Sequence, residues 1–375
     1  MTRQGGLSPS GPVPQPRHIL VVGGAGYIGS VLVRHLLKRG YQVRVLDALL
    51  YDNGETLQNL TEDPRFEFLQ GDFTNGQTLC HALAGITDVV LLAALVGDPI
   101  CKQYPEQAKE INYKAAVGLL EALENYPIDR LIFTSTCSNY GIILGDQPAN
   151  EEAPLRPLSL YAETKVAVER CILDRRERVK YSPTILRVAT AFGMGYRTRF
   201  DLTVNHFTRD LALGRELVVY DQATWRPYCH IEDIGQAIIR VLEHPREMVA
   251  FQVFNVGDNS QNHSKEQLAE MIRQHLPEAT VRYQVGGSDP RDYQVDFSKI
   301  RRVLGFKTRH SVASGVEKLL AAIEAGQFSD VERRPIFYGN YTIPRFDDLP
   351  AANQMGGLPV GPPSSISPEA RQERI

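Results

Sequence analysis

The feature that most constrains the fold is the stretch HILVVGGAGYIGS, residues 18–30, where an apolar run meets three glycines. Gly23, Gly26 and Gly29 form GxxGxxG between a predicted strand and a predicted helix, in a strand–helix–strand unit of about 30 residues. Glycines let the backbone approach a pyrophosphate, and the helix N-terminus offers free N–H groups and a positive dipole end. A tight turn that needs glycine for positive φ is the simpler alternative. The context favours a dinucleotide-binding turn.

Asp47 ends the next predicted strand, about 20 residues after the glycines, where a carboxylate accepts hydrogen bonds from the adenosine ribose. The same carboxylate would repel a 2′-phosphate, and the next residues, Ala48 and Leu49, supply no compensating arginine. The sequence therefore predicts NAD rather than NADP as the cofactor. A strand-end aspartate that caps a turn is the alternative.

Strands and helices alternate through the first half of the chain, and the strands are apolar runs without polar alternation. This pattern is typical of a parallel sheet covered on both faces, so we predict a Rossmann-type, doubly wound α/β fold. The predicted strands are 18–24, 41–47, 65–72, 87–95, 129–136 and 182–190, and the main helices are 27–40, 105–126 and 160–179. After about residue 190 the pattern becomes irregular, which indicates a smaller C-terminal α/β substrate-binding lobe.

These patterns divide the chain into four parts. Residues 1–17, rich in Pro, Gly and Ser, are predicted to be a disordered arm. Residues 18–190 are the NAD-binding Rossmann domain, to which some later segments return, and 191–335 are the substrate-binding lobe. Residues 336–375 are an extended tail, either mobile or lying on a partner subunit.

Composition excludes several functions. The net charge is −3 with 43% apolar residues, so neither nucleic acid nor a membrane surface is an expected partner. The five cysteines are widely spaced without a CxxC pair, which predicts reduced thiols in a cytoplasm and no metal site. The N-terminus lacks the apolar core of a secretion signal.

Tyr161 and Lys165 in LYAETK lie four residues apart on a predicted helix, so both face one side. A free tyrosine is a poor base at neutral pH, but a nearby ammonium group and the positive nicotinamide ring lower its pKa. A half-buried tyrosine beside a solvated lysine is the alternative. Their place after the fifth strand of a dinucleotide fold, with Thr136 upstream, favours catalysis.

At this point the chain resembles the extended short-chain dehydrogenase/reductase family, in its nucleotide-sugar epimerase and dehydratase branch, over residues 18–325. The resemblance rests on GGAGYIG, Asp47, GDF at 71–73, LAAL at 92–95, INYKAAVGLLEA, TSTCSNYG, YAETK, WRPYCHIEDI and DPRDYQVDFSKIRRVLGF. It implies a nucleotide-diphosphate sugar substrate and often a homodimer, with 105–126 and 160–180 as the candidate interface helices.

The resemblance also implies roles for individual residues. Thr136 would hydrogen-bond the sugar hydroxyl that is oxidised, and Tyr161 would take its proton. Lys165 would also contact the nicotinamide ribose. The remaining cofactor positions are Tyr27, Ile28, Asp72, Phe73, Ala93, Ala94 and Asn112, and the substrate positions are Asn205, Arg226 and Arg291. Two arginines suit a diphosphate because each offers a planar fork of donors, although surface salt bridges are the simpler alternative for each.

Cys137 and Ser138 follow Thr136 where the family's dehydratases carry Asp-Glu or Ser-Glu, and its decarboxylases also use a Glu at the second position. Without that carboxylate, epimerisation at C4 through a transient keto sugar is favoured over dehydration. Three alternatives stay open: a dehydratase or reductase, an epimerase of the 3,5 type with Cys137 as acid/base, and a dinucleotide sensor without enzymatic activity. In the simpler alternative Cys137 only shapes the loop.

His230 and Asp233 are interpreted as holding the lobe junction.

Overall fold

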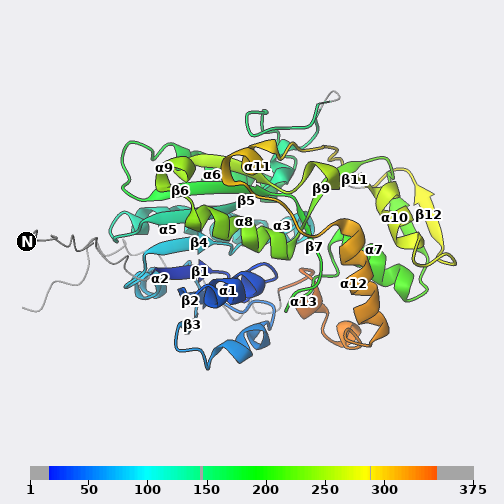
Figure 1. Cartoon of the computed structure of the whole chain (residues 1–375), viewed down its shortest axis with the longest axis horizontal. Coiled ribbons are helices and arrows are strands. Elements are labelled where there is room, and N and C mark those ends of the chain that lie inside the picture. The colour runs from blue at the N-terminus through cyan, green and yellow to red at the C-terminus, as the bar shows by residue number, and fades with distance from the viewer. Residues whose placement is uncertain (1–16, 144–146, 288, 344–375) are drawn as a thin grey trace, which may run out of the picture.

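The structure is a computed structural model that describes residues 17–143, 147–287 and 289–343. It consists of a layered α/β part, built on a central sheet, and a smaller lobe at one end of it (Figure 1). Within the described ranges, no helix is both long and apolar enough to span a lipid bilayer.

The central sheet has seven strands, all paired in parallel, which confirms the predicted doubly wound fold. Their order is β10 (Gln252–Val256), β6 (Ser182–Val188), β5 (Arg130–Thr136), β4 (Asp88–Leu91), β1 (His18–Val22), β2 (Gln42–Asp47) and β3 (Phe66–Gln70). Strands β4, β5 and β6 are buried along their whole length, as expected for strands covered on both faces. Strand β10 comes from the later part of the sequence and returns to the edge of this sheet.

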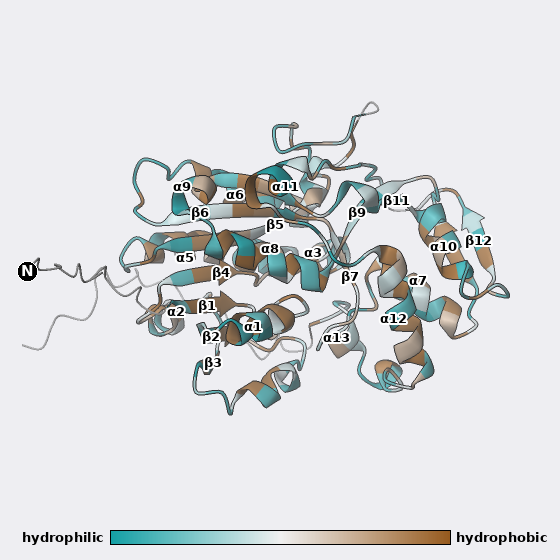
Figure 2. Ribbon diagram, viewed as in Figure 1, coloured by the Kyte–Doolittle hydropathy of each residue, from teal (hydrophilic) through white to brown (hydrophobic). Residues whose placement is uncertain are grey.

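Alternate residues of β1 supply two separate cores. Ile19 and Val21 face a core that includes α1 (Gly29–Lys38), α8 (Ile231–Glu243) and α11 (Ser298–Leu304). Leu20 and Val22 face the other core, which includes α2 (Gly76–Leu83), α5 (Ala116–Leu123) and α6 (Leu160–Leu173). Figure 2 shows the hydrophobic residues gathered along the central strands, while the flanking helices are mixed.

Two predicted helices are shorter or more interrupted than the sequence suggested. The range 105–126 forms α4 (Pro105–Lys109), a π-helical stretch (Glu110–Ala115) and α5. The helix predicted over 160–179 ends at Leu173 and continues as turns. A π-helical stretch inside an α-helix re-aims the side chains that follow it and is frequent near functional sites.

The smaller lobe has two short sheets and its own core. One sheet contains β7 (Thr190–Phe192), β9 (Trp225–His230) and β11 (Asn262–Ser264), and the other contains β8 (Leu217–Tyr220) and β12 (Val281–Gln284). Helices α7 (Thr203–Ala212), α10 (Lys265–Arg273) and α12 (Val312–Glu324) pack with them. His230 stacks on His310, and Asp233 accepts hydrogen bonds from the backbone N–H groups of residues 309 and 310, which is the structural role predicted for them.

The described start of the predicted C-terminal tail is packed against the rest of the chain. Residues 336–343, assigned to an extended tail, pack on their own chain instead: Phe337 and Tyr338 are buried, and Ile343 is 2% exposed. Apolar side chains at these positions account for the difference, because burying them stabilises the segment. Residues 1–16 of the predicted arm and 344–375 of the predicted tail lie outside the described residues.

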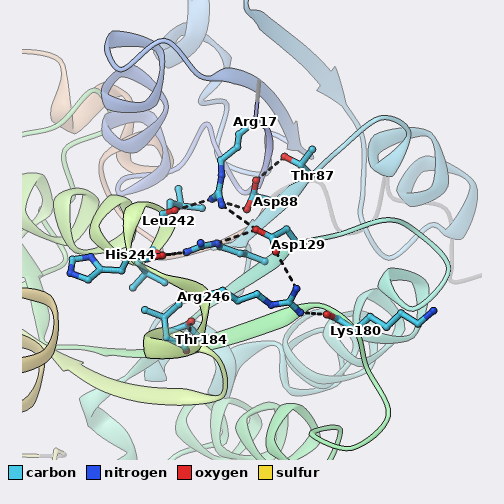
Figure 3. Close-up of polar contacts among 12 residues, drawn as sticks. Arg17, Thr87, Asp88, Asp129, Lys180, Thr184, Leu242, His244 and Arg246 are labelled. Carbon is cyan, nitrogen blue, oxygen red and sulfur yellow. Dashed lines mark hydrogen bonds and ion pairs between the residues drawn. The ribbon is translucent and has the colours of Figure 1, made fainter. Parts of the chain in front are cut away.

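Arg17 joins three strand starts at the edge of the sheet where the parallel strands begin (Figure 3). Its guanidinium lies 3.1 Å from the Asp88 carboxylate and 3.0 Å from that of Asp129, and donates to the Leu242 carbonyl. Asp88 is fully buried, and burial raises the pKa of its carboxyl. Arg246 pairs with Asp129 from the other side. This network stabilises the edge opposite the candidate site, because a buried carboxylate needs such partners.

Candidate functional site

A cavity of about 1220 Å³ lies where the central strands end and the smaller lobe begins. Its walls come from the loops after β1, β2, β4, β5 and β6 and from the lobe. In open α/β sheets this edge is where ligands bind.

The glycine turn forms one wall, and its tight packing explains the glycines. Gly23 has φ +90°, and a Cβ there would lie 2.7 Å from the Ala93 nitrogen. A Cβ on Gly29 would lie 2.3 Å from the Gly23 carbonyl oxygen. Gly26 has more room, with its nearest neighbour at 3.3 Å. The turn leads directly into the N-terminus of α1, which suits an anion.

Asp47 holds the turn in place from the end of β2. Its two carboxylate oxygens accept hydrogen bonds from the Ala25 and Leu49 backbone N–H groups, both at 2.9 Å. Burial raises the pKa of this carboxyl, while these donors act in the opposite direction. Asp47 lines the cavity, so the same carboxylate faces the place predicted for the adenosine ribose.

The other predicted cofactor residues are distributed around this end. Tyr27 and Ile28 line the cavity within the turn, and the Tyr27 hydroxyl donates to the Gly193 carbonyl, which ties the turn to the smaller lobe. Phe73 is buried beside the cavity, and Asp72 accepts from the Thr74 N–H at 2.9 Å. Ala93 and Ala94 also line the cavity, at the end of β4.

The predicted catalytic residues meet in the middle of the same cavity. Thr136 ends β5, and its hydroxyl oxygen accepts from the Ser138 N–H at 3.1 Å. Ser159 caps the N-terminus of α6, which carries Tyr161 and Lys165 on the face toward the cavity. The Lys165 ammonium group donates to the Thr134 carbonyl at 2.8 Å and lies 5.9 Å from the centre of the Tyr161 ring.

Burial shifts both catalytic pKa values. It lowers the pKa of Lys165 to about 8 and raises the pKa of Tyr161. Arg199 and Arg291 act in the opposite direction on Tyr161, because their positive charges favour the phenolate. The positive nicotinamide ring of a bound cofactor would add to their effect.

A buried polar network supports this centre from behind. Glu169 lies one further turn along α6 and accepts hydrogen bonds from Ser135, Asn139 and Arg187. The Arg187–Glu169 ion pair has a separation of 2.7 Å, with side chains that are 6% and 2% exposed. The network therefore joins α6, which carries Tyr161 and Lys165, to β6 and to β5, which ends at Thr136.

The far end of the cavity holds both predicted substrate arginines. Asp289 lies between them, 2.7 Å from the Arg291 Nε and 3.0 Å from Arg226 Nη2. Arg291 also donates to the Ser138 hydroxyl at 3.2 Å and pairs with Asp98 at 2.8 Å. Asp289 therefore holds two guanidinium groups side by side, as a diphosphate site requires.

Three predicted residues do not reach the cavity. The Asn112 side chain accepts a hydrogen bond from the Leu95 backbone N–H at 2.7 Å and donates one to the Leu95 carbonyl at 3.0 Å. Its amide therefore positions the loop after β4 instead of a ligand. Asn205 bonds Gly193, Tyr27 and Arg199 and is fully buried. Cys137 is 1% exposed, packs in the core, and donates to the Arg187 carbonyl at 3.2 Å. Burial raises the pKa of this thiol, which opposes a role in proton transfer.

Sequence reasoning missed several residues that line the cavity. Ser138, next to the buried Cys137, faces it from the catalytic loop. Arg197, Arg199 and Asp201 face it from the loop after β7, and Asn340 from the C-terminal segment. The sequence does contain a signal for these residues, the alternating charges of RTRFD at 197–201. Because this segment lies far from the glycine turn in the sequence, its place in the same cavity was not predicted. Among the described residues, no cluster of His, Cys, Asp and Glu is arranged to hold a metal ion.

Comparisons with known proteins agree with this arrangement. Residues 19–257 match the model of the NAD-dependent epimerase/dehydratase family. UDP-glucose 4-epimerase of Lactobacillus helveticus is 30% identical over 314 residues, which cover 78% of this chain and 92% of that protein.

Two solved structures share the fold over most of the chain. UDP-glucuronic acid 4-epimerase from Bacillus cereus, in complex with UDP-glucuronic acid and NAD, is 26% identical with a TM-score of 0.74, covering 82% of this chain and 99% of that one. The dTDP-glucose 4,6-dehydratase DesIV from Streptomyces venezuelae, with NAD bound, is 26% identical with a TM-score of 0.75, covering 83% and 98%.

The pKa of Lys165 makes a prediction about stability. Its folded-state pKa of about 8 lies below the ordinary value of 10.5, so the unfolded chain binds more protons between these two pH values. The free energy of unfolding of the wild type should therefore rise relative to that of Lys165→Met as pH increases from 8 to 10.5, by up to about 3 kcal/mol. Urea unfolding of both proteins at several pH values measures this, and a constant difference would contradict the lowered pKa.

Proposed function

Because the chain belongs to the NAD-dependent epimerase/dehydratase family, we propose that it epimerises a nucleotide-diphosphate sugar at C4 through a transient keto sugar. The observation that carries this proposal is the order of groups along one cavity. The glycine turn and Asp47 lie at one end, Thr136, Tyr161 and Lys165 in the middle, and Arg226 and Arg291 at the other end. NAD bound at the first end would supply the hydride acceptor.

Each residue of the central group has a distinct role in the proposal. Thr136 positions the C4 hydroxyl of the sugar, and the Tyr161 phenolate removes its proton while the hydride leaves C4. Lys165 supports the phenolate electrostatically and is itself fixed by the Thr134 carbonyl. After the keto sugar turns its other face, the hydride returns to C4 and Tyr161 returns the proton, which completes the inversion with atoms and electrons balanced.

The arrangement disfavours dehydration because that reaction needs a further acid and base. Ser138, not a carboxylate, faces the cavity beside Thr136. Asp98, whose negative charge raises the pKa of Tyr161, already pairs with Arg291 and accepts from the Ser159 hydroxyl at 2.6 Å. Among the described cavity-lining residues there is no glutamate. A dehydratase, as in DesIV, remains the second candidate because that relative shares the fold.

The other two alternatives have less support. Proton transfer by Cys137, which a 3,5-type epimerase would need, conflicts with the burial of its thiol in the core. A sensor without enzymatic activity would not need the tyrosine and lysine that both lie on α6 and line the cavity.

Turnover in deuterated water with a panel of UDP-, GDP-, CDP- and dTDP-sugars tests the proposal. We expect a 4-epimer without solvent deuterium, because the hydride that leaves C4 is the one that returns. Tyr161→Phe should lower kcat by at least about 100-fold, the usual scale of general acid–base catalysis. Product analysis by mass spectrometry and NMR measures both results.

The Cys137→Ala variant is the matched control, since its side chain lies next to Thr136 in sequence but faces the core. Its kcat should stay within about threefold of the wild type. Deuterium at C3 or C5 that disappears in Cys137→Ala would establish the thiol alternative and refute simple 4-epimerisation. Full activity of Tyr161→Phe would overturn every enzymatic assignment made here.

We also propose that the working form is a cytoplasmic homodimer. The five free cysteines are compatible with a reducing compartment. Tyr113, in the π-helical stretch before α5, is an exposed aromatic residue on the predicted interface helices, where a second subunit would bury it. Analytical ultracentrifugation should give twice the chain mass of 41.9 kDa. A monomer at micromolar concentration, or recovery of the protein in a secreted fraction, would contradict this proposal.

A further inference from the structure

The cavity has a further wall, beyond the glycine turn, that the proposed mechanism does not use. This wall consists of Arg197, Arg199 and Asp201, from the loop after β7, together with Asn340 and Tyr341 from the C-terminal segment. The cavity-facing residues at the same end include Asp47 and Tyr51, from the end of β2 and the loop that follows it.

Arg197 is a buried cation without a carboxylate partner among the described residues. Its side chain is 2% exposed, and its guanidinium lies 4.1 Å from the centre of the Tyr51 ring. Nη2 donates to the Ile336 carbonyl and to Asn340 Oδ1, at 3.0 and 2.9 Å, whereas the buried Nε has no hydrogen-bond partner. A buried charge that pairs only with neutral groups is costly unless an anion joins it.

The neighbouring carboxylates are already occupied. Arg199 binds Asp201 with two hydrogen bonds, at 3.0 and 2.6 Å. Asp47 accepts from two backbone N–H groups. The charges of Asp47 and Asp201 act on Arg197, but neither carboxylate forms an ion pair with it, and a ligand anion would complete its coordination.

The C-terminal segment fixes the position of Arg197. Residues 334–343 run from the smaller lobe to the Rossmann part, and we call them the strap. At its start, Arg334 pairs with Glu55 at 2.9 Å, and at its end Ile343 packs in the core beside the central sheet. Between them, Asn340 accepts from Arg197 and donates to the Val96 carbonyl at 2.9 Å. The strap thus crosses the cavity end that contains Asp47.

Two ligand anions could meet Arg197: the pyrophosphate of the cofactor and the diphosphate of the sugar nucleotide. The second already has two guanidinium groups at the far end, beside Ser138. Arg197 lies instead near Asp47 and Tyr51, whose loop is joined to the glycine turn by the hydrogen bond from Asn53 to the Ala25 carbonyl. A 2′-phosphate is disfavoured there by the Asp47 carboxylate.

We propose that Arg197, held by the strap, binds the pyrophosphate of NAD from the side opposite the glycine turn and retains the cofactor between turnovers. The backbone N–H groups of the turn would bind one side of the anion and the guanidinium the other. Dissociation of NAD would then require the strap to release Arg197. The proposal rests on the NAD cofactor and not on the identity of the sugar or on C4 as the reacting carbon.

The rate at which bound NAD exchanges for isotopically labelled NAD tests the proposal. The nucleotide extracted from the desalted holoenzyme is measured by mass spectrometry at successive times. Loss of a charged hydrogen bond corresponds to roughly a tenfold to hundredfold change in an equilibrium constant. Exchange should therefore accelerate by about 10- to 100-fold in Arg197→Met and by a smaller factor in Asn340→Ala, which removes the strap's side-chain contact with Arg197 and leaves its backbone contact through the Ile336 carbonyl.

Arg226→Met is the control, because this arginine lines the same cavity at the far end. Its NAD exchange should stay within about threefold of the wild type, while its affinity for UDP alone should fall. Unchanged exchange in Arg197→Met, with weakened binding of UDP, would place the guanidinium on the sugar nucleotide and overturn the proposal. If the wild type bound NADP as tightly as NAD and Arg197→Met lost this affinity for NADP, the guanidinium would be assigned to a 2′-phosphate. That result would also overturn the proposal.

Arg197→Gln, which removes the charge but keeps hydrogen-bond donors for the strap, is the second variant if Arg197→Met does not fold. Unchanged exchange in a folded Arg197→Gln would refute the role of Arg197, and unchanged exchange in a folded Asn340→Ala would refute the role of Asn340 in holding it. Exchange needs no turnover, so its outcome is independent of whether the protein epimerises sugars.

Discussion

The buried ion pair between Glu169 and Arg187 is the interaction on which the geometry of the catalytic centre depends. Glu169 extends the stripe of Tyr161 and Lys165 along α6, and Arg187 comes from β6. The same carboxylate accepts hydrogen bonds from Ser135 and Asn139, which lie before and after Thr136 in the sequence. Loss of one partner of such a pair costs about 3–5 kcal/mol, because the other charge remains buried. Thr136 and Tyr161 therefore keep their relative positions only while this network is intact.

In the proposed mechanism, the cavity divides its functions along its length. Backbone N–H groups and Arg197 would face the cofactor, and the two arginines that pair with Asp289 would face the sugar nucleotide. Between them, the hydroxyl groups of Thr136, Ser138 and Tyr161 line a region without a free carboxylate among the described residues. Cations on both sides would hold the cofactor and the sugar nucleotide with their reacting ends together, so that the transferred hydrogen has a short path. The proposed role of Arg197 extends this division to Asn340, which accepts a hydrogen bond from its guanidinium.

The sequence was sufficient where function depends on short-range geometry. Gly23 to Gly29 and the pair Tyr161 and Lys165 are defined within one turn and within one helical face, so their placement followed from spacing alone. Asn112 and Asn205 do not line the cavity, because an amide side chain binds whichever backbone group lies nearest, and that depends on the tertiary fold. Cys137 and Ser138 could not be distinguished because the strand ends at Thr136, and the 3₁₀ turn after it decides which side chain faces the core. Arg197 and the strap were missed because their contacts join segments more than 100 residues apart.

The central claim is that the hydrogen removed from the sugar carbon is the one that returns to it, without a protein base acting on a neighbouring carbon. The most direct measurement uses a nucleotide sugar that carries deuterium at C4 and follows the product by NMR in ordinary water. The 4-epimer should form with its deuterium fully retained at C4. Loss of that deuterium to solvent, or its appearance at another carbon of the sugar, would contradict the return of the same hydrogen to C4.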